Sequence, residues 1–189
     1  MTNLGEYGKK QAAALATKMS IVKIDHLYSS EWPRAFQTAE FISNKMDREI
    51  KIHPLVHEIM RNPILDDTDD VSEINKQYHE EIKDNQENFD WKFGGLGESL
   101  NEVIKRAQMV IDFLVEKHPD ETVAIVSHGI FITLMTILIL LGKDWDRKTF
   151  QKLLWSLKLD NTGVCTFEFD PKTSYWTMSG FNDHSHLGG

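Results

Sequence analysis

A histidine and a glycine stand where an apolar strand is expected to turn into an apolar helix. The near-continuous apolar run 122–126 is followed by Ser127, His128 and Gly129, and residues 130–141 are again apolar. Because the first N–H groups of a helix have no partners inside it, an imidazole beside them is suited to holding an anion such as phosphate. Taken alone, a histidine in such a place is more often a structural residue.

An arginine follows a second strand end in a similar way. The predicted strand 25–29 ends at Ser29 and Ser30, and Arg34 falls within the first turn of the helix expected next. An arginine in that place points toward the strand ends, where its planar guanidinium can bind a phosphate group through two hydrogen bonds. The alternative is a surface arginine near a helix start, and spacing alone favours that alternative.

A loop carboxylate is the third candidate. Glu58 comes shortly after the strand predicted for residues 49–53. A loop carboxylate is usually solvated, and this one matters to a site only if it faces the same pocket. No metal and no cofactor is expected. The acidic run 66–70 is typical of a solvated loop whose charges repel one another, and Pro54 prevents the nearby histidines from sharing one zinc-binding helix.

The elements that must position these residues alternate between helix and strand. Residues 99–118 give the clearest helix, because Ser99 and Glu102 have capping-box spacing and apolar residues then recur every three or four positions. The run 122–126 is typical of a strand covered on both faces. The other predicted elements are helices at 5–19, 31–46, 71–88, 130–141 and 146–156, strands at 25–29 and 49–53, and two β runs at 163–169 and 175–181.

This alternation predicts an α/β fold, a three-layer sandwich with a largely parallel central sheet and a C-terminal β-hairpin. We expect a single domain over residues 1–189, since that length is typical of one domain. The irregular segment 59–97 interrupts the pattern and is expected to be a helical or irregular cap insertion over the pocket. In open sheets of this kind ligands bind at the carboxyl ends of the strands, where Ser30 and His128 are expected.

Composition and charge exclude several classes of protein. With 41% hydrophobic and 26% charged residues the chain is not of the disordered class, and a net charge of −8 argues against general binding of nucleic acid or anionic membranes. Cys165 is the single cysteine, which excludes an intrachain disulfide and a four-cysteine zinc site. No signal-peptide pattern is present, and residues 127–129 interrupt the apolar stretch 123–141, so a reducing, cytoplasmic setting is expected.

Together, the candidate residues and the motifs around them resemble the histidine phosphatase superfamily, also called the phosphoglycerate mutase-like family. The similarity extends over residues 4–187 and lies in short motifs that occur in the family's order. These are Leu4, Gly8, Gln11 and Ala12; Tyr28, Ser29, Ser30, Arg34, Ala35, Gln37, Thr38 and Ala39; Leu55 and Glu58; Gly97, Glu98, Ser99 and Arg106; Ser127, His128 and Gly129; Asp160, Asn161 and Thr162; and His186 and Leu187.

The resemblance implies a phosphomonoester hydrolase that works through a phosphohistidine. His128 matches the family's second histidine, which donates a hydrogen bond to the phosphoryl oxygens, and Arg34 matches its second phosphate-binding arginine. Glu58 matches the carboxylate that protonates the leaving group and later activates water, and Gly129 adds to the phosphate site. The implied partners are a small phosphorylated substrate and inorganic phosphate, with a homodimer left open. Such chemistry rests mostly on positioning and on positive groups that face the spreading negative charge.

The sequence departs from the family at its N-terminal end. The family's Arg-His-Gly triplet supplies the nucleophile and precedes the helix that here begins near Leu4, with only residues 1–3 before it. We favour a nucleophile on a segment upstream of this chain, because losing a central strand would leave buried backbone groups unpaired. The alternatives are a catalytically inactive protein that binds phosphate or phosphoesters, and a phosphoglycerate mutase. Neither the charged segment of mutases nor the Gly-x-Trp-Glu-Gly of many phosphatases follows Glu58.

Overall fold

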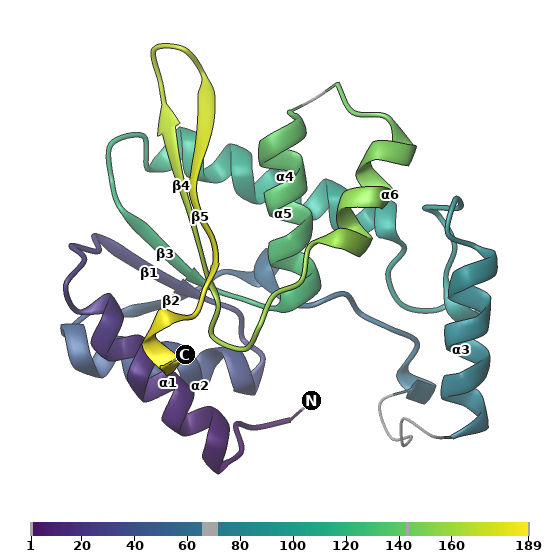
Figure 1. Ribbon diagram of the computed structural model, residues 1–189, viewed down its shortest axis with the longest axis horizontal. Coiled ribbons are helices and arrows are strands. Elements are labelled where there is room, and N and C mark those ends of the chain that lie inside the picture. The colour runs from purple at the N-terminus through teal and green to yellow at the C-terminus, as the bar shows by residue number, and fades with distance from the viewer. Residues whose placement is uncertain (1, 66–71, 143, 189) are drawn as a thin grey trace.

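Helices alternate with parallel strands along most of the chain, and a hairpin follows them near the C-terminal end (Figure 1). The computed structural model describes residues 2–65, 72–142 and 144–188. The helices are α1 (Glu6–Met19), α2 (Pro33–Met46), α3 (Glu73–Asp84), α4 (Leu100–Lys117), α5 (Gly129–Leu141) and α6 (Arg147–Ser156). The strands are β1 (His26–Ser29), β2 (Ile50–Ile52), β3 (Val123–Val126), β4 (Val164–Asp170) and β5 (Tyr175–Asp183).

The central sheet has three parallel strands in the order β2-β1-β3. In its register Leu27 of β1 lies opposite Ile50 of β2 and Ala124 of β3. Because the strands are parallel, their carboxyl ends meet at one edge, and the pairing of Ser29 with Val126 brings the residues after β1 beside those after β3. The sheet register therefore determines where a site can form.

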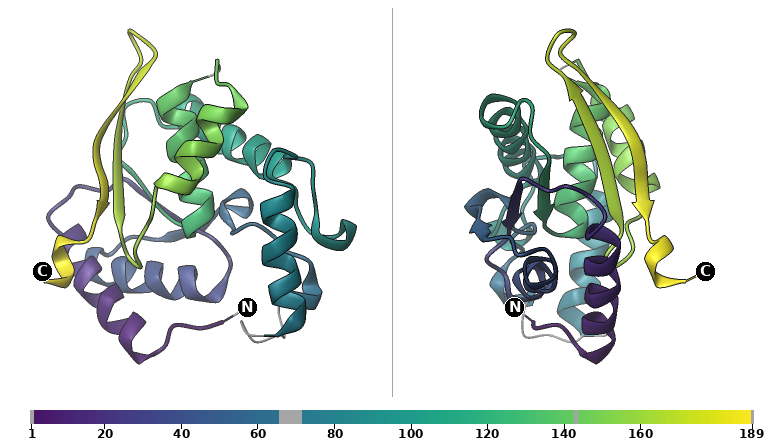
Figure 2. Two further views of the ribbon diagram at one scale, coloured as in Figure 1. Left: turned by 45° about the vertical axis from the view of Figure 1, so that its right-hand side comes forward. Right: turned by 90° about the vertical axis from the view of Figure 1, so that its left-hand side faces the viewer.

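Helices cover both faces of this sheet, which confirms the three-layer α/β prediction (Figure 2). Side chains of a strand alternate between its two faces. Ala124 packs with Leu15 of α1 and Ile42 of α2, whereas its neighbour Ile125 packs on the other side in the core formed by α4, α5 and α6. The amphipathic pattern of α4 is confirmed as well, together with its capping box at Ser99.

The hairpin of β4 and β5 is antiparallel, as its turn sequence predicts, and the structure shows that it forms a two-stranded sheet of its own. Within the part of the chain that the structure describes, β3 pairs with β1 alone and is an edge strand. Both faces of β3 are covered, as predicted, but all four of its residues are half-buried and none is fully buried. The physical reason is that an edge strand has a neighbour on one side only.

The segment 59–97 contains one long helix, α3, which lies at the side of the molecule away from the hairpin (Figure 1). Tyr78 of this helix contacts the rings of Trp91 and Phe93. The acidic run 66–70 lies outside the described residues. That the segment 59–97 forms a cap over the pocket stays a prediction. Among the described residues no helix has the length and apolar character needed to cross a bilayer; α5, the most apolar, has 13 residues.

Candidate functional site

His128 lies between the end of β3 and the first turn of α5, where it is the N-cap residue. It is 4% exposed, and its Nε2 lies 3.0 Å from the Oγ of Ser30, which is fully buried at the end of β1. The parallel pairing of β1 with β3 is what brings these two side chains together from positions 98 residues apart. The structure thus places His128 at the carboxyl edge of the sheet, as predicted.

Arg34 reaches the same place from α2. It is the second residue of that helix, directly after Pro33, whose fixed backbone suits a first helical turn. Its guanidinium carbon lies 5.3 Å from the ring centre of Trp32, and that ring meets the imidazole of His128 edge-to-face at 5.1 Å. Within the described residues Arg34 forms no ion pair with a carboxylate, so this half-buried cation remains available to an anion.

Burial and positive neighbours both act on His128. Burial, together with the smaller effects of the charges of Arg34, His57 and Arg106, lowers the pKa of its imidazole to about 3. The ring is therefore neutral near pH 7 and carries one N–H. A bound phosphate dianion would offset these positive charges and favour the doubly protonated imidazole, which donates from both nitrogens.

The low pKa of His128 makes the free energy of unfolding depend on pH. In the unfolded chain the imidazole titrates near 6.5, so below that pH the unfolded state binds a proton that the folded state excludes down to about 3. Above pH 6.5 this group does not change the free energy of unfolding. As the pH drops below 6.5, the free energy of unfolding should decrease by up to about 1.4 kcal/mol per pH unit. Denaturant unfolding of the wild type and of His128→Asn at pH 7.5, 6 and 5 tests this. Equal losses in both proteins would contradict it.

Glu58 is held against the first turn of α5. Its carboxylate accepts main-chain hydrogen bonds from Ile59 (3.0 Å), Ile130 (3.1 Å) and Phe131 (3.2 Å). The structure therefore brings Glu58, Gly129 and His128 to one helix end. It also corrects the expectation that the N–H groups at this end are unpaired, because the carboxylate takes those of Ile130 and Phe131.

The loop that carries Glu58 is fastened by a buried ion pair that the sequence reasoning left without a role. Arg106, in the middle of α4, donates through Nε and Nη2 to both carboxylate oxygens of Glu98, at 3.1 and 2.9 Å. Its Nη1 donates to the main-chain carbonyls of Leu55 (2.6 Å) and His57 (2.8 Å). One guanidinium thus joins α4 to the loop on both sides of Val56. Arg106 is a positioning residue for Glu58.

His57 is a second residue that the sequence reasoning did not place in the site. Its ring stacks on that of Trp32, with the ring centres 5.8 Å apart and an interplanar angle of 15°. The same Trp32 ring also contacts Arg34 and His128. Its Nδ1 lies 2.7 Å from the carbonyl oxygen of Glu58. Trp32 therefore forms an aromatic platform shared by the candidate groups.

A cleft of about 270 Å³ opens beside this cluster. One wall is the first turns of α5 with Glu58, and the other is the segment that leads from α6 to β4. Its lining residues are Glu58, Gly129, Ile130, Thr133, Leu154, Leu157 and Leu159. The cleft combines a polar end at the candidate site with an apolar wall of leucines.

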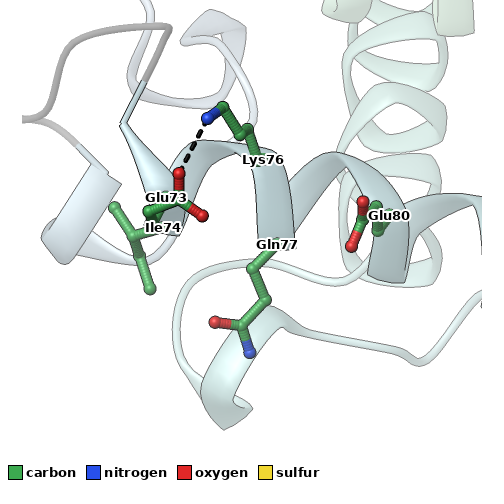
Figure 3. A pocket seen from close by; sticks show the side chains of 5 residues that line it. All are labelled: Glu73, Ile74, Lys76, Gln77 and Glu80. Atoms are coloured by element: carbon green, nitrogen blue, oxygen red, sulfur yellow. Dashed lines mark hydrogen bonds and ion pairs between the residues drawn. The ribbon is translucent and has the colours of Figure 1, made fainter.

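A larger hollow of about 420 Å³ lies along α3, away from these residues (Figure 3). All five residues that line it come from that one helix, and Lys76 is paired with Glu73 at 2.7 Å. Among the described residues no second element lines it, so it does not have the architecture of a ligand site. The convergence of α2, α5 and the Glu58 loop identifies the candidate site instead.

The chain is similar to known proteins over nearly its whole length. Residues 2–184 match the model of the histidine phosphatase superfamily (branch 1). The phosphoglycerate mutase-like protein 4 of Arabidopsis thaliana is 30% identical over 97% of this chain and 76% of its own length. Phosphoserine phosphatase 1 of Hydrogenobacter thermophilus is 29% identical over 98% of this chain and 83% of its own length.

Solved structures show the same fold. A mycobacterial glucosyl-3-phosphoglycerate phosphatase in complex with inorganic phosphate superposes with a TM-score of 0.77 at 20% identity, over 98% of this chain and 89% of that one. A mutant phosphoserine phosphatase from Entamoeba histolytica in complex with phosphoserine gives 0.71 at 24% identity, over 98% and 86%. Because the family model matches nearly the whole length of the chain, the chain belongs to the histidine phosphatase superfamily.

Proposed function

We propose that this protein hydrolyses a small phosphomonoester through a phosphohistidine, with the nucleophilic histidine supplied by a segment upstream of residue 1. The observation that carries the proposal is the convergence of Arg34 and neutral, buried His128 on one edge of the sheet, next to a carboxylate at a helix end. Phosphoryl transfer requires cationic and N–H donors on one side of the phosphoryl group and a proton-transfer group on the other.

In the proposed reaction each group has a separate role. The nucleophilic nitrogen attacks phosphorus and the ester P–O bond breaks, while Arg34 and His128 hold the phosphoryl oxygens. Glu58 gives its proton to the departing alkoxide. It then takes a proton from water as that water attacks phosphorus, the P–N bond breaks, and inorganic phosphate leaves. The position of Glu58 against α5, fixed by Arg106, suits this exchange.

One edge of β3 has no partner strand among the described residues, which supports an upstream nucleophile. A strand that pairs with this edge in parallel would end beside His128, because the carboxyl ends of parallel strands meet at one edge. The half-buried side chains of β3 are those of a strand with room for another neighbour. An Arg-His-Gly triplet encoded in frame upstream of Met1 is the simplest observation in favour of this segment.

The cleft supports a small ester as substrate. Its volume of about 270 Å³ accommodates a small organic group, and its leucines lie across from the polar end formed by Glu58 and Gly129. We infer that the phosphoryl group binds at Arg34 and His128 and that the alcohol part of the ester enters this cleft. One relative is named for phosphoserine, and one structural neighbour is named for glucosyl-3-phosphoglycerate.

Hydrolysis of p-nitrophenyl phosphate by the protein extended upstream tests the proposal. We expect turnover, and we expect Arg34→Ala or His128→Ala to lower kcat about 100- to 1,000-fold, because each removes a group that faces transition-state charge. Arg147→Ala, an exposed arginine on α6, is the matched control and should keep the wild-type rate. An extended protein without turnover would overturn the proposal.

A phosphate-binding protein without catalysis is the second candidate. It is favoured by one observation: Arg34, His128 and Glu58 are already assembled within residues 2–188. It predicts that millimolar phosphate raises the melting temperature of the 189-residue chain without turnover by any form of the protein. Interconversion of phosphoglycerate isomers by the extended protein would instead support a mutase.

A further inference from the structure

Two histidines and a glutamate meet at the end of the sheet opposite the candidate site. His26 is the first residue of β1, His118 caps the C-terminal end of α4, and Glu121 lies just before β3. The Oε2 of Glu121 lies 3.1 Å from the Nε2 of His26 and 2.7 Å from the Nδ1 of His118. At a rise of about 3.3 Å per residue, the four steps from His26 to Ser30 separate this cluster from the candidate site by roughly 13 Å.

The spacing of the three ligand atoms fits a divalent metal. They lie within 4.8 Å of one another. In a tetrahedral zinc site with bonds near 2.0–2.1 Å the ligand atoms are about 3.3 Å apart. The side chain of His118 is 8% exposed, that of His26 is 23% exposed and that of Glu121 is 43% exposed. The cluster is therefore buried at His118 and open to solvent at Glu121.

We propose that His26, His118 and Glu121 form a binding site for a divalent transition-metal ion, with zinc as the best fit and solvent as the fourth ligand. Two imidazoles and one carboxylate are ligands that zinc prefers, and three protein ligands leave one coordination position open. The carbonyl end of α4 and the carboxylate of Asp25, which is close enough to His26 to feel its charge, add negative potential there.

The outer contacts of the two histidines determine how well they can bind a metal. In the metal-free protein both rings donate to Glu121, so the opposite nitrogen of each ring accepts: His118 Nε2 from the hydroxyl of Tyr28 (3.1 Å) and His26 Nδ1 from the ammonium of Lys51 (3.1 Å). A metal takes the two nitrogens that face Glu121, and each ring proton must then move to the outer nitrogen.

This tautomer change has opposite consequences at the two rings. On His118 the outer N–H can donate to the oxygen of Tyr28, which is an acceptor as well as a donor, and this contact supports metal binding. On His26 the outer N–H would face the ammonium of Lys51, which has no acceptor, so the lysine must move away. Lys51 therefore opposes the metal and Tyr28 favours it.

Titration of the untagged 189-residue chain with Co²⁺, followed by its visible tetrahedral absorption bands and by displacement with Zn²⁺, tests the site. We expect one ion per chain. His26→Ala and Glu121→Gln, which alter the two more exposed ligands, should weaken binding about 10-fold or more. Lys51→Met should strengthen binding, and Tyr28→Phe should weaken it. His79→Ala, an exposed histidine on α3, is the matched control and should bind as the wild type does.

Thermal unfolding of each variant, measured without metal, separates loss of the site from loss of the fold. Binding that is weakened in a variant with wild-type melting temperature supports the site. Absence of saturable binding by the wild type, equal binding by His26→Ala, or weaker binding by Lys51→Met would each overturn it. In those cases the three side chains act only as a hydrogen-bonded clasp between α4, β1 and β3.

Discussion

Replacing Arg106 by methionine should lower the free energy of unfolding by about 3–5 kcal/mol. The substitution leaves the carboxylate of Glu98, whose side chain is 11% exposed, without its cation, and it removes the donor from the carbonyls of Leu55 and His57. Burying an unpaired charge costs far more than an intact pair contributes. Urea unfolding followed by circular dichroism measures the effect.

An exposed ion pair provides the control. Lys76 pairs with Glu73 on α3 at 2.7 Å, with side chains 57% and 91% exposed, so Lys76→Met should cost less than about 1 kcal/mol. The double variant Arg106→Met with Glu98→Gln should be less destabilised than the single one, because the orphaned charge is gone. A loss below 1 kcal/mol for Arg106→Met alone would show that this pair does not fasten the Glu58 loop.

Replacing Arg34 by alanine should weaken the binding of inorganic phosphate about 10- to 100-fold. Hydrogen bonds to a charged group contribute roughly 1.5–3 kcal/mol when both partners are held in place, and the Trp32 ring holds this guanidinium. Isothermal titration with phosphate at pH 7 measures the change. Arg34→Lys should recover part of the affinity, because the charge remains but the planar pair of donors does not.

Arg147→Ala controls for the loss of one positive charge from an acidic protein. Arg147 lies exposed at the start of α6, with its guanidinium 5.3 Å from the ring centre of Phe89. Its removal changes the net charge of −8 by the same amount as the removal of Arg34. Equal phosphate affinities for the two variants would mean that phosphate responds to overall charge and that Arg34 is not part of a site.

Most of the fold could be predicted because local signals and tertiary packing agree. The capping box at Ser99 and the apolar periodicity behind it give α4 its observed start, and the run 122–126 gives β3. The half-buried state of β3 could not be predicted from its own residues. It depends on the sheet order, which makes β3 an edge strand, and a strand's sequence does not specify its neighbours.

His128 could be predicted because the topology places it at a strand end, whereas Arg34 became a site candidate through the family resemblance, since spacing alone favoured a surface arginine. The role of Arg106 had a signal that was not used. It lies three residues after Val103 and four before Val110, both fully buried, so it is a charged residue on the apolar face of a helix. Such a residue must find a buried partner, which here is Glu98.

Two other features of the site carry no such signal. His57 reaches Trp32 through the path of a loop, and Trp32 lies between an arginine and two histidines only once α2 and α5 are packed. The hydrogen bonds from α5 to Glu58 likewise depend on that loop path. Long-range contacts made by loops follow from the packed structure and are not encoded in periodicity.

The most direct test of the proposed mechanism is to identify the phosphorylated residue. The protein extended upstream is mixed with p-nitrophenyl phosphate, quenched in base, where an N–P bond survives, and digested for mass spectrometry. The mechanism predicts one phosphoryl group on a histidine of the upstream segment, with His128 unmodified, and a lower yield in Arg34→Ala. A phosphoryl group on His128 or His57, or turnover with no base-stable and acid-labile adduct, would contradict it.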